Sequence, residues 1–199
     1  MAEKDSGTND SVRGYNLIDE AKKTLEAACP STVMCRHHNP SNQRHLSNIN
    51  DVNIPGSDSP VSVTLQFFAS KGITKQEMVT LFRAHTVGVA HCKSRAKPDP
   101  TMDPALNAKL VKLCNSRGDP ATPLDQKSSF EILAKKGLLQ IDQQLALDAG
   151  TKGFVLDFAS NGDKFQKGFA NAIVKMGEID VLVGNQGEIR KKCSVFNRN

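Results

Sequence analysis

The histidines are the side chains of this 199-residue chain best suited to bind a transition metal or to move a proton near neutral pH. They are His37, His38, His45, His85 and His91. His85 differs from the others because it continues an apolar stripe through Met78, Leu81 and Phe82 at helical spacing. From the residues alone, His85 is either a core histidine with satisfied nitrogens or a ligand. The core alternative is favoured because ligand histidines are rare.

Three other histidines lie in the segment RHHNPSNQRH, at positions 37, 38 and 45. They could form a transition-metal site, but they have neither helical spacing nor a supporting cysteine. The polar composition favours a solvated loop. The segment belongs to a stretch over 36–59 whose density of Asn, Pro and Gly predicts a long loop.

The helix that would position His85 has clear end signals. Thr74 and Glu77 have the capping-box spacing, and the apolar stripe continues from Met78 to His85 and Val89. A preceding helix is predicted from Ser59 and Pro60, with a hydroxyl cap and proline in the first position, to Gly72.

The rest of the chain is also predicted to be helical, so the fold class is all-α. Residues 1–11 are expected to be a disordered tail, and 178–199 a mostly irregular arm in which a short strand or two near 179–183 would leave the fold class unchanged. Helices are predicted over 12–28, from Asp103 to 115, from Ser128 to 137, over 143–149, and from Asp163 to 177.

The formal net charge of +5 favours acidic partners such as polysaccharide. Nucleic-acid binding is not expected, because there is no Trp, one Tyr and no recognisable motif. No apolar stretch is long enough for a membrane helix, and the first residues lack a secretory signal, so the chain as written is expected in the cytosol.

The segment MVTLFRAHTVGVAHC strongly resembles the proximal-helix signature of the secretory plant (class III) haem peroxidases. VRGYNLIDEAKKTLEAACPSTVMC, PVSVTLQFFASKGITKQEMVTL, LLQIDQQL and FANAIVKMGEIDVLVGNQGEIRKKCSVFN resemble other segments of that family in the same order. The resemblance implies a partial haem-peroxidase helical fold over 12–199, with the proximal half retained and the distal half largely missing. It also implies an oxidoreductase that reduces hydrogen peroxide and oxidises phenolic donors in the response to oxidative stress.

The resemblance assigns His85 as the proximal ligand of iron in haem b, and Asp142 as the carboxylate that holds the other ring nitrogen. By its local sequence alone, Asp142 would be an ordinary N-cap of the helix over 143–149. Thr86, Asp125 and Ser128 match ligands of the family's proximal calcium. The set is incomplete because SSFEILAKKG replaces the family's FDN motif, and a loop with a capping serine is the alternative for Asp125 and Ser128.

Five cysteines leave one unpaired. The resemblance pairs Cys92 with Cys114 and Cys35 with Cys193, and leaves Cys29 alone. Such disulfides imply the oxidising extracellular or vacuolar compartments of the family, and a monomer is expected.

The family's distal motif RxxFHDCF, which carries the acid–base histidine and an arginine, does not occur in the 199 residues. Activity is therefore expected to be impaired. His91 is interpreted as part of a helix end, and Arg83 replaces a glycine usual in the family, where it could crowd the haem. The alternatives are a non-enzymatic peroxidase-like remnant, a basic polysaccharide-binding helical protein, or a gene-model product that does not fold.

Overall fold

The computed structural model describes residues 12–33, 54–85, 89–92, 99–115, 121–123, 132–181, 188–195 and 197. The chain divides into two compact units, and each is described by itself. The first unit comprises Met1–Asn53 with Glu178–Asn199, and the second is Ile54–Gly177. The predicted tail over 1–11 and most of the predicted loop over 36–59 lie outside the described residues.

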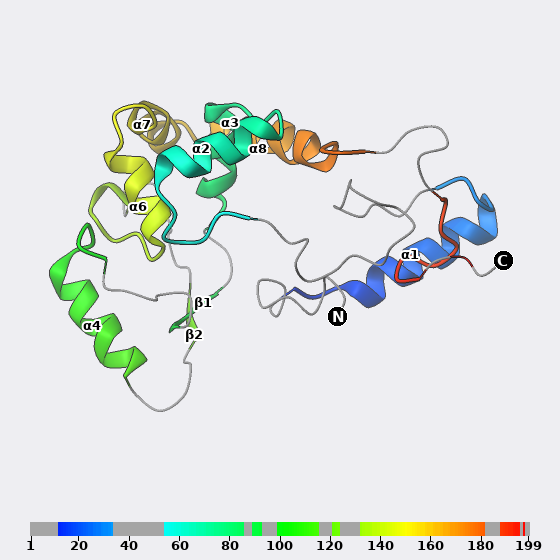
Figure 1. Ribbon diagram of the computed structural model, residues 1–199, viewed down its shortest axis with the longest axis horizontal. Helices are drawn as coiled ribbons and strands as arrows, with labels where there is room; N and C mark the ends of the chain where they lie inside the picture. The colour runs from blue at the N-terminus through cyan, green and yellow to red at the C-terminus, as the bar shows by residue number, and fades with distance from the viewer. Residues whose placement is uncertain are drawn as a thin grey trace. The chain divides into compact units, whose positions relative to one another are not determined.

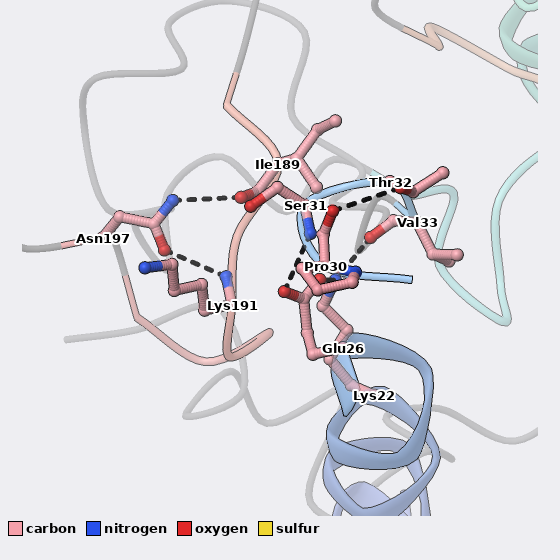
Figure 2. Close-up of polar contacts among 9 residues, drawn as sticks. All are labelled: Lys22, Glu26, Pro30, Ser31, Thr32, Val33, Ile189, Lys191 and Asn197. Atoms are coloured by element: carbon pink, nitrogen blue, oxygen red, sulfur yellow. Dashed lines mark hydrogen bonds and ion pairs between the residues drawn. The ribbon is translucent and has the colours of Figure 1, made fainter. Parts of the chain in front are cut away.

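In the first unit, helix α1 spans Tyr15–Ala28. It begins later than predicted because Gly14 has a left-handed φ of 95° and occupies the N-cap position. Lys22 links the last turns of α1 to the segment that follows the helix. Its side chain is 3% exposed and donates hydrogen bonds to Glu26 and to the carbonyl of Val33 (Figure 2). A buried ammonium is tolerated here because both partners compensate its lost hydration.

The C-terminal arm of the same unit is held by side-chain contacts rather than by regular structure. Asn197 accepts a hydrogen bond from the backbone N–H of Lys191 and donates one to the carbonyl of Ile189 (Figure 2). Residues 178–181 and 188–195 form no strand, so the arm is irregular wherever the structure describes it.

In the second unit, helices α2 (Val61–Ser70) and α3 (Lys75–Arg83) form a hairpin. Gly72 turns the chain with a φ of +75°, a conformation in which a side chain would be strained. The prediction for the start of α2 was wrong in detail: Pro60 is the N-cap, and no side chain caps the helix. The Pro60 carbonyl accepts hydrogen bonds from the N–H and from the hydroxyl of Thr64. The carbonyl of an N-cap residue normally accepts the first bond of its helix.

Helix α4 spans Pro104–Cys114 and is capped by Asp103, as the sequence predicts. Helices α6 (Gln140–Leu147), α7 (Lys152–Ser160) and α8 (Gly162–Gly177) follow (Figure 1). Helix α7 was not predicted, and α8 is capped by Asn161, which accepts from the Lys164 N–H, rather than by Asp163. The predicted helix from Ser128 to 137 begins outside the described residues, and of its described part only residues 132 and 133 are helical, so the predicted end at Gly137 was wrong.

Two short strands pair antiparallel, β1 (Val89–His91) with β2 (Ala121–Pro123). The sequence pattern predicted that His91 belongs to a helix end, whereas the structure places it in β1, so that prediction was wrong. The all-α fold class is confirmed, with this small sheet as an addition. Within the described ranges, no helix is both long and apolar enough to cross a membrane.

The core of the second unit lies where α3, α6, α7 and α8 meet. Each helix contributes a fully or nearly fully buried apolar side chain: Met78, Ile141, Phe158 and Ala172. A second cluster joins α4 to the start of α6 through Met102, Leu110 and Leu138. The first of these clusters packs α6, α7 and α8, which are far from α3 in the sequence, against α3.

Candidate functional site

Helix α3, which leads to His85, starts at the predicted capping box. The Thr74 N–H donates to the Glu77 carboxylate at 2.7 Å, and the Glu77 N–H donates to the Thr74 hydroxyl at 3.3 Å. Glu77 also accepts from Lys175 of α8 at 2.8 Å. Partial burial raises the pKa of Glu77, but the hydrogen bonds from Lys175 and Thr74 outweigh this effect and lower the pKa below its usual value.

The other end of α3 is also attached to α8. The Arg83 guanidinium lies over the Phe165 ring, 4.0 Å from its centroid. Because α3 and α8 run antiparallel, Glu77 meets Lys175 at one end and Arg83 meets Phe165 at the other. Between these two contacts, Gly168 of α8 faces Thr80 of α3.

His85 itself lies just beyond the helix, because α3 ends at Arg83 and Ala84 is its C-cap. The predicted continuous stripe to Val89 was therefore wrong, since Val89 belongs to β1. The His85 N–H donates to the Phe82 carbonyl at 3.0 Å, and its ring meets the Phe82 ring edge to face at 5.4 Å between centroids. This tight turn fixes the backbone of His85 and packs one side of its ring.

The structure brings His85 and Asp142 together. The Nδ1 atom of His85 lies 3.1 Å and 3.2 Å from the two carboxylate oxygens of Asp142. Asp142 is not the N-cap that its local sequence favours: α6 starts at Gln140, and the cap position is Leu139. Asp142 therefore lies in the first turn of α6, where the helix dipole stabilises a carboxylate, and from there its side chain reaches His85.

Burial and charge act in opposite directions on His85. Its side chain is 37% exposed and that of Asp142 is 1% exposed. Burial lowers the pKa of His85, but the hydrogen bond and negative charge of Asp142 outweigh burial and raise the pKa above its usual value. In the neutral ring, a carboxylate at Nδ1 places the proton on that nitrogen and leaves the Nε2 lone pair available to a ligand.

Asp142 also lines a small apolar cavity of about 20 Å³. Its walls come from α3, α6, α7 and the segment before α6: Val79, Phe82, Arg83, Ile132, Leu145 and Val155. A space of this size has room for about one water molecule, so a large cofactor does not fit there. A planar group such as haem would have to approach the His85 side chain, which is 37% exposed. A lone pair on Nε2 would suit an iron ligand.

The remaining predicted site residues are only partly described. Thr86, Asp125 and Ser128 of the predicted calcium site lie outside the described residues, as do His37, His38 and His45. Among the residues that the structure does describe, no group of three or more His, Cys, Asp or Glu side chains could hold a metal ion. His91 is part of β1.

The cysteines are placed as follows. Cys92 and Cys114 form a disulfide that links the end of β1 to the last residue of α4. Cys193 is disulfide-bonded, and Cys35, the partner that the resemblance implies, lies outside the described residues. Cys29 is free and exposed.

Sequence reasoning missed the two attachments of α3 to α8. Glu77 and Lys175 are 98 residues apart in the chain, and no spacing rule predicts such a pair. Arg83 was expected to crowd a cofactor, yet its guanidinium stacks on Phe165. The sequence offered only a glutamate on one amphipathic helix and a lysine on another as a signal for the first attachment, and many other acidic and basic residues could pair in the same way.

Known plant proteins align with nearly the whole chain. The peroxidase family model matches residues 41–161. The chain is 46% identical to Peroxidase 44 of Arabidopsis thaliana, with 98% of the chain and 73% of that protein covered. It is 38% identical to Peroxidase 57 and 39% identical to Peroxidase 28 of the same plant, each 74% covered.

The first of these alignments extends over 227 residues, more than the 199 residues of the chain, so the relative has internal residues without a counterpart here. The matched family segment contains α3, His85 and Asp142, which are the parts of the site that the structure brings together. The chain therefore belongs to the peroxidase family and is a member of the plant class III group.

Proposed function

We propose that this chain binds haem b through Nε2 of His85 and that it is a haem-dependent peroxidase of low activity. The observation that carries the proposal is the contact between His85 Nδ1 and the buried Asp142 carboxylate, at 3.1 Å. Such a contact orients an imidazole and increases its basicity, which is what an iron ligand requires. The iron of the bound haem would supply electron exchange with hydrogen peroxide.

The overall reaction proposed is that of the family. Each hydrogen peroxide takes up two electrons and two protons and becomes two water molecules, while two phenolic donors each lose one electron and one proton. Within the chain, Asp142 holds the proton on Nδ1 of His85 and keeps the ring in one orientation. No residue of the printed sequence is assigned to move protons on the peroxide side, and loss of such a group costs about 10² to 10⁴ in rate.

The remaining family properties are part of the same proposal. The Cys92–Cys114 disulfide supports an oxidising compartment, outside the cell or in the vacuole. A calcium ion on Thr86, Asp125 and Ser128 would bind weakly, because a family carboxylate is missing from the sequence. Acidic cell-wall polysaccharide is a further proposed partner, on the basis of the net charge of +5.

The test is titration of the haem-free chain with hemin, followed by the Soret band. We expect a shifted band for the unchanged chain and for the control His45→Ala, and loss of the shift for His85→Ala. In His85→Gly, added imidazole should restore the band by entering the vacated space. A band that is the same in His85→Ala and the unchanged chain would refute the assignment of the ligand.

Catalysis needs a second measurement. Oxidation of guaiacol by the hemin-loaded chain should exceed that of free hemin by a small factor and should depend on His85. If hemin binds through His85 but turnover does not exceed that of free hemin, haem binding stands and the enzymatic part is wrong. If hemin does not bind at all, the non-enzymatic alternative is favoured.

A further inference from the structure

The residue that joins the end of α3 to α8 lies two positions before His85. Arg83 is the last residue of α3, and its guanidinium is 4.0 Å from the centroid of the Phe165 ring. A cation over an aromatic face is attracted by the ring quadrupole, and the attraction grows when water is excluded. Arg83 is half-buried, so its contact with Phe165 is partly desolvated.

The ring that receives Arg83 is itself anchored in the core. Phe165 meets Phe158 at 6.3 Å and Phe169 at 5.9 Å between ring centroids. Phe158 is 0% exposed, so this aromatic group cannot shift without disturbing the packing between α7 and α8. Arg83 is thus attached to a rigid part of the second unit.

Movement of Arg83 would be transmitted to the site through a short, tightly bonded turn. Ala84 donates from its N–H to the Leu81 carbonyl at 3.1 Å, and His85 does the same to Phe82 at 3.0 Å. Phe82, from the same turn, lies edge to face against the His85 ring. A rotation of this turn would therefore change both the distance from Nδ1 to Asp142 and the direction of Nε2.

We propose that Arg83 is a positioning residue, and that its stacking on Phe165 sets the direction in which His85 presents Nε2. This inference rests on the proposed haem-binding function, but it concerns the haem-free chain as well. It accounts for Arg83 at a position where crowding of the cofactor was expected: the side chain is directed to α8.

The structure offers a matched control at the opposite end of the same helix pair. Lys175 binds Glu77 and ties the start of α3 to α8, more than one helical turn from His85. A purely structural role for Arg83 predicts that Arg83→Met and Lys175→Met have similar effects. A positioning role predicts that both lower the melting temperature, and that only Arg83→Met changes the His85 ring.

The first measurement is ¹⁵N NMR of the histidine rings in the haem-free chain, which reports which ring nitrogen carries the proton. At a pH above the raised pKa of His85, where the ring is neutral, we expect the proton predominantly on Nδ1 in the unchanged chain and in Lys175→Met, and a mixture of the two neutral forms in Arg83→Met. Phe165→Leu keeps an apolar side chain but removes the ring, and should give the same mixture if Arg83→Met does not fold. Arg83→Lys, which keeps the cation, should restore part of the original signal.

The second measurement is hemin affinity, which should fall about two- to fivefold in Arg83→Met and remain unchanged in Lys175→Met. If the His85 signals of both Arg83→Met and Phe165→Leu match those of the unchanged chain, the inference is wrong. If no variant, and not even the unchanged chain, binds hemin, the proposed function fails while the NMR result still decides the role of Arg83.

Discussion

Replacement of Asp142 by asparagine tests the central pair of the site with little change in volume. The amide side chain of the Asp142→Asn variant can still accept a hydrogen bond from Nδ1, but the negative charge that raises the pKa of His85 is gone. Burial of the ring remains, and a hydrogen bond to a neutral amide favours the charged ring less than one to a carboxylate, so the pKa of His85 should fall below that of the unchanged chain. The effect follows from charge, because the contact at 3.1 Å need not be lost.

The size of the effect on stability follows from burial and contact distance. A hydrogen bond to a charged group contributes about 1.5 to 3 kcal/mol. Because the His85 side chain is 37% exposed, solvent screening reduces the expected contribution to about 1 to 2 kcal/mol. Since the pKa of His85 is raised on folding, this contribution is complete below the unfolded value of about 6.5 and is lost as the pH rises through the folded value.

The assay is urea unfolding of the haem-free chain and of Asp142→Asn at about pH 5.5 and about pH 9, with an NMR titration of His85. The difference in free energy of unfolding should be larger at the lower pH. Asp157→Asn is the control, because it breaks an exposed pair with Lys164 and should leave His85 unaffected. An equal loss of stability at both pH values, or an unchanged His85 titration, would show that the charge of Asp142 does not act on His85.

The other predictions concern the framework of the site. Glu77→Gln should destabilise the chain by about 1 kcal/mol near neutral pH, and the loss should disappear as acid protonates Glu77 below its lowered pKa, in urea curves at different pH. Reduction of the Cys92–Cys114 disulfide, which spans 22 residues, should cost about 3 kcal/mol in thermal unfolding, and no change would contradict a loop-closing role. Gly72→Ala should cost about 1 kcal/mol through its positive φ, whereas an alanine placed at Gly153 should not destabilise α7. Chelation of calcium should leave the melting temperature nearly unchanged, because the predicted site lacks a carboxylate.

Local signals in the sequence were sufficient to predict several features correctly. Thr74 with Glu77, and Asp103 ahead of Pro104, mark helix starts because their side chains satisfy backbone N–H groups only a few residues away. The motif around His85 also identifies the family, since its residue order is carried in one short segment. These features depend on neighbours in the chain, so they are visible without a structure.

Other helix boundaries differ from those that the local sequence signals predict. Helix α3 stops at Arg83 although the apolar stripe continues to Val89, and Asp142 enters the first turn of α6 instead of capping it. Helix α7 was missed; glycines at 150 and 153 lie on either side of its start, and glycine has a low helix propensity. In each case packing against another helix decides the outcome, which local propensity cannot predict.

Residue types and their order were enough to establish that the chain is helical, that it is a peroxidase relative and that His85 is its candidate ligand. The contact of His85 with Asp142, the two attachments of α3 to α8 and the exposure of the His85 ring came from the folded structure alone. The physical reason is that these contacts join residues 57 to 98 positions apart, and their formation depends on how several amphipathic helices pack at once.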